Sequence, residues 1–188
     1  MTRRELIADA GIRLIARSGV RAMTHLSVDQ EAGLPRGSTS YYARTRRALT
    51  TLVVNRLAEG TQMDLDGLVI PATLTSAEAV QLATGFVDHL ARREEAQATR
   101  FALLFELRDD DELRALLTAD APVRTLLIEK AAVLLQATGM ADPAPHAPDL
   151  VGLLDALLMY RVAQAAPIDD TAVLRAYFAG LITGGSFS

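Results

Sequence analysis

The 188-residue sequence contains no cysteine and no tryptophan, and only 5% of its residues are aromatic. Without cysteine the chain can form no disulfide, no thiolate metal site and no cysteine nucleophile. Its three histidines, His25, His89 and His146, leave little material for a catalytic zinc, so we expect neither a metal nor another cofactor. Half of the residues are hydrophobic and 22% are charged, a composition that excludes wholesale disorder.

Enzyme motifs and membrane segments are also missing from the sequence. There is no G-x-S-x-G nucleophile elbow, no phosphate loop, no dinucleotide fingerprint and no H-E-x-x-H pair. The longest apolar run, Val151–Tyr160, is broken by Asp155 and is far too short to span a bilayer, and the N-terminal stretch is too charged for a signal peptide. We therefore expect a soluble cytoplasmic protein that is not an enzyme and has no membrane partner. Converging carboxylates or histidines in a cavity would instead favour an enzyme built on a helical bundle.

The net charge of -4 hides an uneven distribution along the chain. Residues 1–60 contain ten arginines and five acidic residues, a net charge of +5, whereas residues 61–188 contain nine basic and 18 acidic residues, a net charge of -9. This asymmetry predicts a basic module that meets a polyanion and an acidic body that does not. The densest acidic run, Asp109–Glu112, is more typical of a solvated helix N-terminus than of a cation site.

Apolar residues recur at spacings of three and four along most of the chain, and strand patterns are nearly absent. The pattern predicts an all-α fold of about nine helices, with Thr24 and Thr75 as N-caps and Gly33 as a helix-ending residue. After a first helix that ends at Ser18 and Gly19, the expected helices are 25–32, 35–42, 46–69, 75–93, 96–107, 111–117, 122–138, 150–165 and 171–182. The proline-rich segment 141–149 is expected to be a loop.

Residues 24–47 combine two short helices with a tight turn at Gly33 and Leu34, the arrangement of a helix-turn-helix. In this motif the second helix lies in the major groove of double-stranded DNA. Arg36 is suited to pair with guanine or to contact a phosphate, and the neighbouring hydroxyls are suited to phosphates. Two adjacent tyrosines point about 100° apart, so we expect one in the core and the other at the DNA backbone. The predicted DNA-binding residues are Thr24, His25, Arg36, Gly37, Ser38, Thr39, Ser40, Tyr41, Tyr42 and Arg46.

Residues 3–58 resemble the N-terminal DNA-binding domain of the tetracycline-repressor (TetR) family of bacterial regulators. The resemblance lies in the Ala-Arg-Ser-Gly end of the first helix, in residues 28–38 (Val-x-x-x-Ala-Gly-Leu-Pro-Arg-Gly-Ser) and in residues 40–49 (Ser-Tyr-Tyr-Ala-Arg-Thr-Arg-x-Ala-Leu). Two positions depart from the family. Ala43 stands where the family usually has a core Phe, and Leu26 stands where relatives with a Thr-His pair often have Arg.

The resemblance implies a DNA-binding domain at residues 1–45, joined by helix four, about 46–69, to a ligand-binding and dimerisation domain within residues 46–188. It also implies a homodimer held by the last two long helices and a ligand cavity in each C-terminal domain. The residues agree in part, because segment 150–162 is apolar on nearly every face and needs cover on all sides. The expected interface residues are Leu150, Val151, Leu154, Leu158, Leu174, Tyr177, Phe178 and Leu181. The expected ligand-binding residues are Phe86, His89, Phe101, Phe105, Met159 and Tyr160, for most of which core packing is the default interpretation.

These observations predict a ligand-responsive transcriptional regulator, most simply a repressor. It would bind an inverted-repeat operator as a homodimer and would be released by a small apolar effector. The alternative is a small-molecule binding or sequestering protein that has lost specific operator binding, an interpretation that Ala43 and Leu26 keep open.

Overall fold

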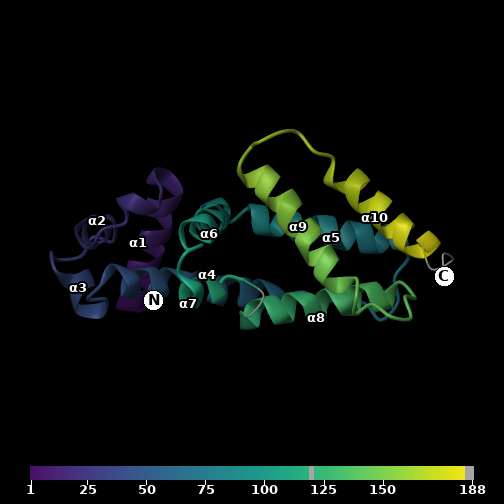
Figure 1. The fold of residues 1–188 in the computed structure, drawn as a ribbon, viewed down its shortest axis with the longest axis horizontal. Helices are drawn as coiled ribbons and strands as arrows, with labels where there is room; N and C mark the ends of the chain where they lie inside the picture. Colours follow the sequence, from purple (N-terminus) through teal and green to yellow (C-terminus); the bar gives the residue numbers. More distant parts are fainter. Residues whose placement is uncertain (119–120, 185–188) are drawn as a thin grey trace. The chain divides into compact units, whose positions relative to one another are not determined.

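The structure is a computed structural model that describes residues 1–118 and 121–184, with the backbone alone for 182–184. Within these ranges the chain forms ten α-helices, one short 3-10 turn and no strand, so the prediction of an all-α fold is confirmed (Figure 1). The elements are α1 (Arg3–Ser18), η1 (Val20–Ala22), α2 (His25–Glu31), α3 (Ser38–Tyr42), α4 (Arg46–Asp66), α5 (Ser76–Ala91), α6 (Glu94–Glu106), α7 (Asp111–Ala115), α8 (Pro122–Ala137), α9 (Ala147–Val162) and α10 (Asp170–Gly184).

Threonine caps begin several helices, among them the two at Thr24 and Thr75 that the sequence predicted. Thr24 Oγ1 accepts a hydrogen bond from the N–H of Ser27 at 3.1 Å, and Ser27 Oγ accepts one from the N–H of Thr24 at 2.8 Å. Thr75 and Glu78 exchange the equivalent pair of bonds at the start of α5, at 3.2 and 2.7 Å. Each exchange satisfies N–H groups that a helix N-terminus leaves without an intrahelical partner.

Two helices begin three residues away from their predicted starts. α3 begins at Ser38 and not at Pro35, because Gly37 has a φ of 92°, which no right-handed helix contains. Arg36 therefore lies in the turn before α3. α9 begins at Ala147 and not at residue 150, because a proline in the first helical turn has no N–H that needs an intrahelical partner. The expected loop at 141–149 is correspondingly shorter.

The chain packs as two compact units. The first unit comprises the described residues of Met1–Asp64 and Glu94–Thr125, and α1 packs there against η1, α2 and α6. Its buried apolar centre includes Ile7, Ile15, Met23, Val28, Leu49, Val53 and Leu103. Arg13 and Arg17 of α1 both bind the Glu31 carboxylate at the end of α2, each at 2.8 Å. This core and these two ion pairs fix the positions of α1 and α2 before the turn at Gly33.

The second unit comprises Leu65–Arg93 and the described residues from Leu126 onward. α5 packs there against α9 and α10. The buried centre of the unit includes Ala79, Val80, Ala83, Leu135, Leu150, Leu174 and Phe178. No helix among the described residues combines the length and the apolar character that crossing a membrane requires. The predicted division at residues 45 and 46 concerns where DNA and ligand bind, and it stays a prediction.

Candidate nucleic-acid interface

A buried carboxylate holds the helix-turn-helix together. Asp29 of α2 is 2% exposed and accepts hydrogen bonds from the Gly37 N–H (2.6 Å), the Thr39 N–H (2.7 Å) and the Thr39 hydroxyl (2.6 Å). Gly37 is left-handed, a conformation that glycine adopts without strain. Asp29 thus satisfies N–H groups at the start of α3 from a neighbouring helix and fixes the turn between the two.

The same contacts keep this carboxylate ionised. Burial by itself would raise the pKa of Asp29, but the hydrogen bonds from Thr39 and Gly37, together with the charge of His25, outweigh burial and hold that pKa below its ordinary value. His25 in turn donates from Nε2 to the carbonyl oxygen of Ala43, at 2.7 Å. Ala43 is 1% exposed and belongs to the apolar core, so this departure from the family pattern lies inside the packed first unit.

Most of the predicted DNA-binding residues lie at the surface of the first unit. Thr24, Arg36, Gly37, Ser40, Tyr41 and Arg46 are exposed, and His25, Ser38 and Tyr42 are half-buried. The two tyrosines differ, as the sequence predicted for adjacent helical positions. Tyr41 is 81% exposed, whereas Tyr42 packs against the core, and their rings meet edge to face with centroids 5.1 Å apart.

Thr39 is the exception among these residues. Its side chain is fully buried, and both its hydroxyl and its N–H are bound to Asp29. A hydroxyl in this position cannot reach a base edge or a phosphate while α3 is folded. The expected DNA contact of Thr39 is therefore corrected to internal support of α3.

The arginines near α3 differ in how they are held. Arg36 and Arg44 are exposed and have no ion pair or hydrogen-bonding partner within the described ranges. Arg46, by contrast, donates to the carbonyl oxygens of Val20 at 2.8 Å and Met23 at 3.2 Å, which ties the start of α4 to η1. A phosphate contact by Arg46 would have to use its remaining N–H groups, whereas Arg36 and Arg44 carry whole guanidinium groups open to solvent.

The expected dimer-interface residues lie largely inside the second unit. Leu150, Val151, Leu158, Leu174 and Phe178 are at most 4% exposed, and Leu154, Tyr177 and Leu181 are half-buried. α9 is covered by α5 of its own chain, which supplies the cover that the sequence left to a partner. The five buried side chains have no surface left for a partner, so their assignment to an interface is corrected to the core of the unit.

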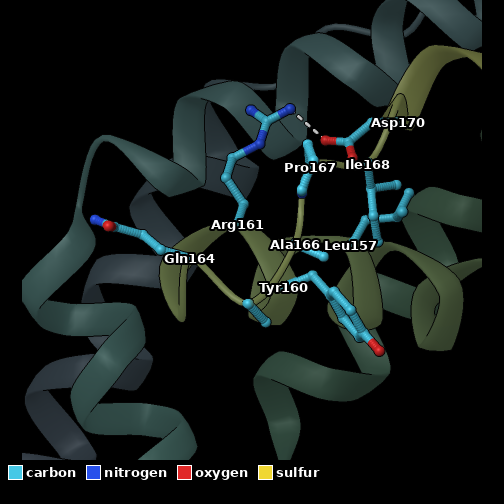
Figure 2. Close-up of a pocket in the computed structure, with 9 residues that line it drawn as sticks. Leu157, Tyr160, Arg161, Gln164, Ala166, Pro167, Ile168 and Asp170 are labelled. Carbon is cyan, nitrogen blue, oxygen red and sulfur yellow. Dashed lines mark hydrogen bonds and ion pairs between the residues drawn. The ribbon is translucent and has the colours of Figure 1, made fainter.

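A pocket of about 440 Å³ opens in the second unit where α9 passes into the loop before α10 (Figure 2). It is lined by Leu157, Tyr160, Arg161, Gln164, Ala165, Ala166, Pro167, Ile168 and Asp170. The guanidinium of Arg161 pairs with the buried carboxylate of Asp170 and with Asp88 of α5. The hydrogen bond to Asp88 and the charge of Asp170 raise the pKa of Arg161 further above its ordinary value. This cluster joins three helices of the second unit, and two of its members, Arg161 and Asp170, line the pocket.

The expected ligand-binding residues do not form one site. Tyr160 lines this pocket, but Phe86, His89 and Met159 do not. Phe101 and Phe105 belong to the first unit. There, the guanidinium of Arg100 lies over the ring of Phe101, with 4.3 Å between Arg100 Cζ and the ring centroid. Phe105 is 71% exposed. Among the described residues, no cluster of three or more histidine or acidic side chains could hold a metal ion.

Two charged positions escaped prediction from the sequence. Asp29 stands in a stretch of mixed polar residues, and its residue type does not predict burial. The one signal for burial is its position in the helix, beside Val28 and three residues before Ala32, both of which face inward. Arg161 lies in the last turn of a long apolar helix. Its partner Asp88 is 73 positions away, and no pattern in the sequence around Arg161 predicts that pairing.

Fold and site together define a helix-turn-helix regulator with an all-helical body. A family model described as "Tetracyclin repressor-like, C-terminal domain" matches residues 74–184, more than half of the chain. The chain therefore belongs to the tetracycline-repressor (TetR) family of transcriptional regulators. The family that the resemblance in residues 3–58 implied is thus confirmed by a match to a different part of the chain.

Solved structures share this fold over nearly the whole length. A TetR-family member from Streptomyces coelicolor A3 covers 96% of this chain and 98% of its own, with a TM-score of 0.70 at 23% identity. A transcriptional regulator from Rhodococcus sp. Rha1 covers 97% of both chains, with a TM-score of 0.77 at 16% identity. The multidrug binding protein EbrR, complexed with ethidium, covers 96% and 98%, with a TM-score of 0.67 at 24% identity. No curated protein matches the sequence.

Proposed function

We propose that this protein is a ligand-responsive repressor that binds an inverted-repeat DNA operator as a homodimer. The observation that carries the proposal is the position of Arg36. It is exposed, makes no ion pair or hydrogen bond within the described ranges, and lies on a turn that the buried Asp29 fixes against α2. Because the backbone of this turn is already fixed, only the Arg36 side chain has to be ordered when it pairs with guanine in the major groove. DNA binding accordingly belongs to residues 1–45 and ligand binding to the rest of the chain.

The other contacts follow from exposure. Ser40 and Tyr41 point outward from α3 and can donate hydroxyl hydrogen bonds to phosphate oxygens, and Arg44 adds a positive charge beside them. Thr24 stands exposed at the start of α2, where its N–H and hydroxyl already serve the helix cap. These residues position the protein on the DNA backbone, and Arg36 supplies sequence preference.

A homodimer would bring two such surfaces to the two halves of an operator. The five buried leucine, valine and phenylalanine side chains cannot form the dimer interface. We propose instead that small exposed residues of α9 and α10 form it. Gly152 and Ala156 lie one turn apart on α9, and Ala172 and Ala176 one turn apart on α10, so a partner's helices can approach closely. Ala156→Glu should convert a dimer to a monomer in sedimentation experiments, whereas Ala77→Glu, at an exposed position of α5, should not.

The effector site in this proposal is the pocket beside Tyr160. Its volume of about 440 Å³ lies within the range of ligand sites, about 300–1,000 Å³. EbrR is a multidrug binding protein that has been seen with ethidium and with proflavin, and these planar molecules are suitable first probes for this chain. A ligand that binds one conformation of the dimer better than the other would shift the population away from the one that fits the operator.

The test of the proposed function is selection of binding sequences from random double-stranded DNA, followed by a mobility-shift assay with the selected duplex. We expect an inverted repeat, retarded by wild type and weakened by Arg36→Ala but not by Arg175→Ala, an exposed arginine of α10. A protein that enriches no sequence above competitor DNA but still binds ethidium or proflavin would be a small-molecule sequestering protein, and the repressor proposal would then be wrong.

A further inference from the structure

Arg47, in the first turn of α4, is held by two carboxylates of the first unit. Its Nη1 lies 2.6 Å from Asp110 Oδ2, and its Nη2 lies 2.5 Å from Glu112 Oε2. The Arg47 side chain is 50% exposed, so it remains accessible to solvent while it is paired. The pairing unites residues more than 60 positions apart in the sequence.

Arg47 differs in this respect from the other arginines near α3. Arg36 and Arg44 meet no acidic group within the described part of the chain, and Arg46 is bound by backbone carbonyls. An arginine paired with two carboxylates forms a cluster with a net charge of -1. Such a cluster repels a phosphate, although the same arginine on its own would attract one.

The two carboxylates are held differently. Asp110 Oδ1 accepts a hydrogen bond from the Leu113 N–H at the start of α7, at 3.1 Å, while Oδ2 faces Arg47. The fold therefore fixes Asp110 at this position. The Glu112 side chain is 88% exposed, and among the described residues its carboxylate makes no hydrogen bond or ion pair other than with Arg47. Exposed ion pairs of this kind are weak, so Glu112 can release the arginine easily.

We propose that Asp110 and Glu112 compete with the DNA backbone for Arg47 and so limit the affinity of the protein for DNA. The proposal rests on the proposed function, because it assumes that the start of α4 faces the phosphates. Arg47 then has two exclusive partners, the acidic pair in the free protein and a phosphate in the complex. Each binding event has to separate Arg47 from its carboxylates, which lowers affinity for operator and unselected DNA alike.

The experiment measures binding of the full chain to a labelled duplex of unselected sequence over salt concentrations of about 50–200 mM. The test variant is the double substitution Asp110→Asn with Glu112→Gln. Asparagine still accepts the Leu113 hydrogen bond at the helix cap, so the change removes charge and keeps the cap. We expect the variant to bind roughly two- to fivefold more tightly. The slope of log K against log salt should steepen by up to about 0.9, because the counterion released from the phosphate that Arg47 contacts is no longer offset by cations that return to two freed carboxylates.

Two further variants separate this competition from a general loss of negative charge. Asp109→Asn removes a charge from the same acidic run, but Asp109 pairs with Arg108 and not with Arg47, so its salt slope should equal that of wild type. Adding Arg47→Ala to the test variant should abolish the gain, whereas Arg47→Ala alone should change binding little. Glu112→Gln alone should give part of the gain, which keeps the test valid if the double substitution unfolds the chain.

The outcomes distinguish a failure of the proposed competition for Arg47 from a failure of the proposed DNA-binding function. If wild type binds DNA and both test variants bind no more tightly, or if Asp109→Asn gives an equal gain, the competition is refuted and the proposed function stands. If neither wild type nor the variants retard any DNA, the proposed function fails and the competition fails with it.

Discussion

Asp29→Ala tests whether a buried carboxylate organises the DNA-binding surface. The substitution removes three hydrogen bonds to a charged acceptor that is 2% exposed. Both donors of the fully buried Thr39 lose their partner, and the N–H of the exposed Gly37 loses its bond as well. Three such bonds are worth about 1.5–3 kcal/mol each, and the cost of burying the carboxylate offsets part of this. Removing one member of a buried charged network costs about 3–5 kcal/mol. We expect a loss of that size in the first unit.

Two milder variants should rank below this one. Asp29→Asn keeps an oxygen for Thr39 but turns an amide group towards the Gly37 N–H, donor against donor, and should cost about 1–3 kcal/mol. Thr39→Val removes one hydroxyl with little change of shape and should cost about 1 kcal/mol. Hydrogen exchange of peptides from residues 25–43 measures these losses locally, with peptides of the second unit as internal reference. Exchange in Asp29→Asn as slow as in wild type would refute the role of the carboxylate.

The same carboxylate should make the first unit sensitive to acid. Because the pKa of folded Asp29 lies below its ordinary value, the ionised form stabilises the fold fully above the unfolded pKa of about 3.9. This contribution is lost as the pH falls below that value and through the lower folded pKa. Asp29→Asn has nothing to titrate there, so the difference in exchange between wild type and variant should shrink over this range. A difference that stays constant with pH would contradict the assignment.

Three other substitutions test particular contacts. Gly11→Ala places a methyl group 2.6 Å from Val53 Cγ2 and should destabilise the chain by about 1–3 kcal/mol in thermal unfolding, whereas Gly85→Ala, with open space around it, should not. Arg36→Ala should weaken binding to the selected operator by about 1–3 kcal/mol and relax preference at one base pair; equal weakening on all sequences would make it a phosphate contact. Arg161→Met leaves the buried carboxylate of Asp170 without its arginine and should lower stability by about 1–3 kcal/mol. Faster hydrogen exchange in peptides from α9 and α10 would show this loss.

Local patterns predicted the helices well because their causes are local. The caps at Thr24 and Thr75 and the reversal at Gly33 depend on residues three or four positions apart, which the sequence displays directly. The start of α3 could not be predicted in the same way. Pro35 is a good first helical residue, but the left-handed conformation of Gly37, two positions later, moves the start of the helix to Ser38. A hydrogen bond from the Gly37 N–H to Asp29 of α2 stabilises that conformation.

Partners distant in the sequence explain the other differences. Thr39 has a hydroxyl and a position in the motif that are typical of a DNA contact. Only its burial against Asp29 shows that it faces inward. Leu150 and Leu174 belong to helices that are apolar on most faces, and periodicity cannot say whether α5 of the same chain or a second subunit covers them. Sequence patterns give the direction of a side chain, whereas the identity of its neighbour depends on tertiary packing.

The four tyrosines give the chain a convenient optical property. With no tryptophan present, its near-ultraviolet fluorescence comes from Tyr41 and Tyr42 in the first unit and from Tyr160 and Tyr177 in the second. Burial, and the nearby charge of Asp149, raise the pKa of Tyr177, so its phenolate band should emerge late in an alkaline titration. Tyr41 is 81% exposed, and a Tyr41→Trp substitution would give the chain a single indole on α3. Its emission would then report contact with DNA at a wavelength that no other residue of the chain shares.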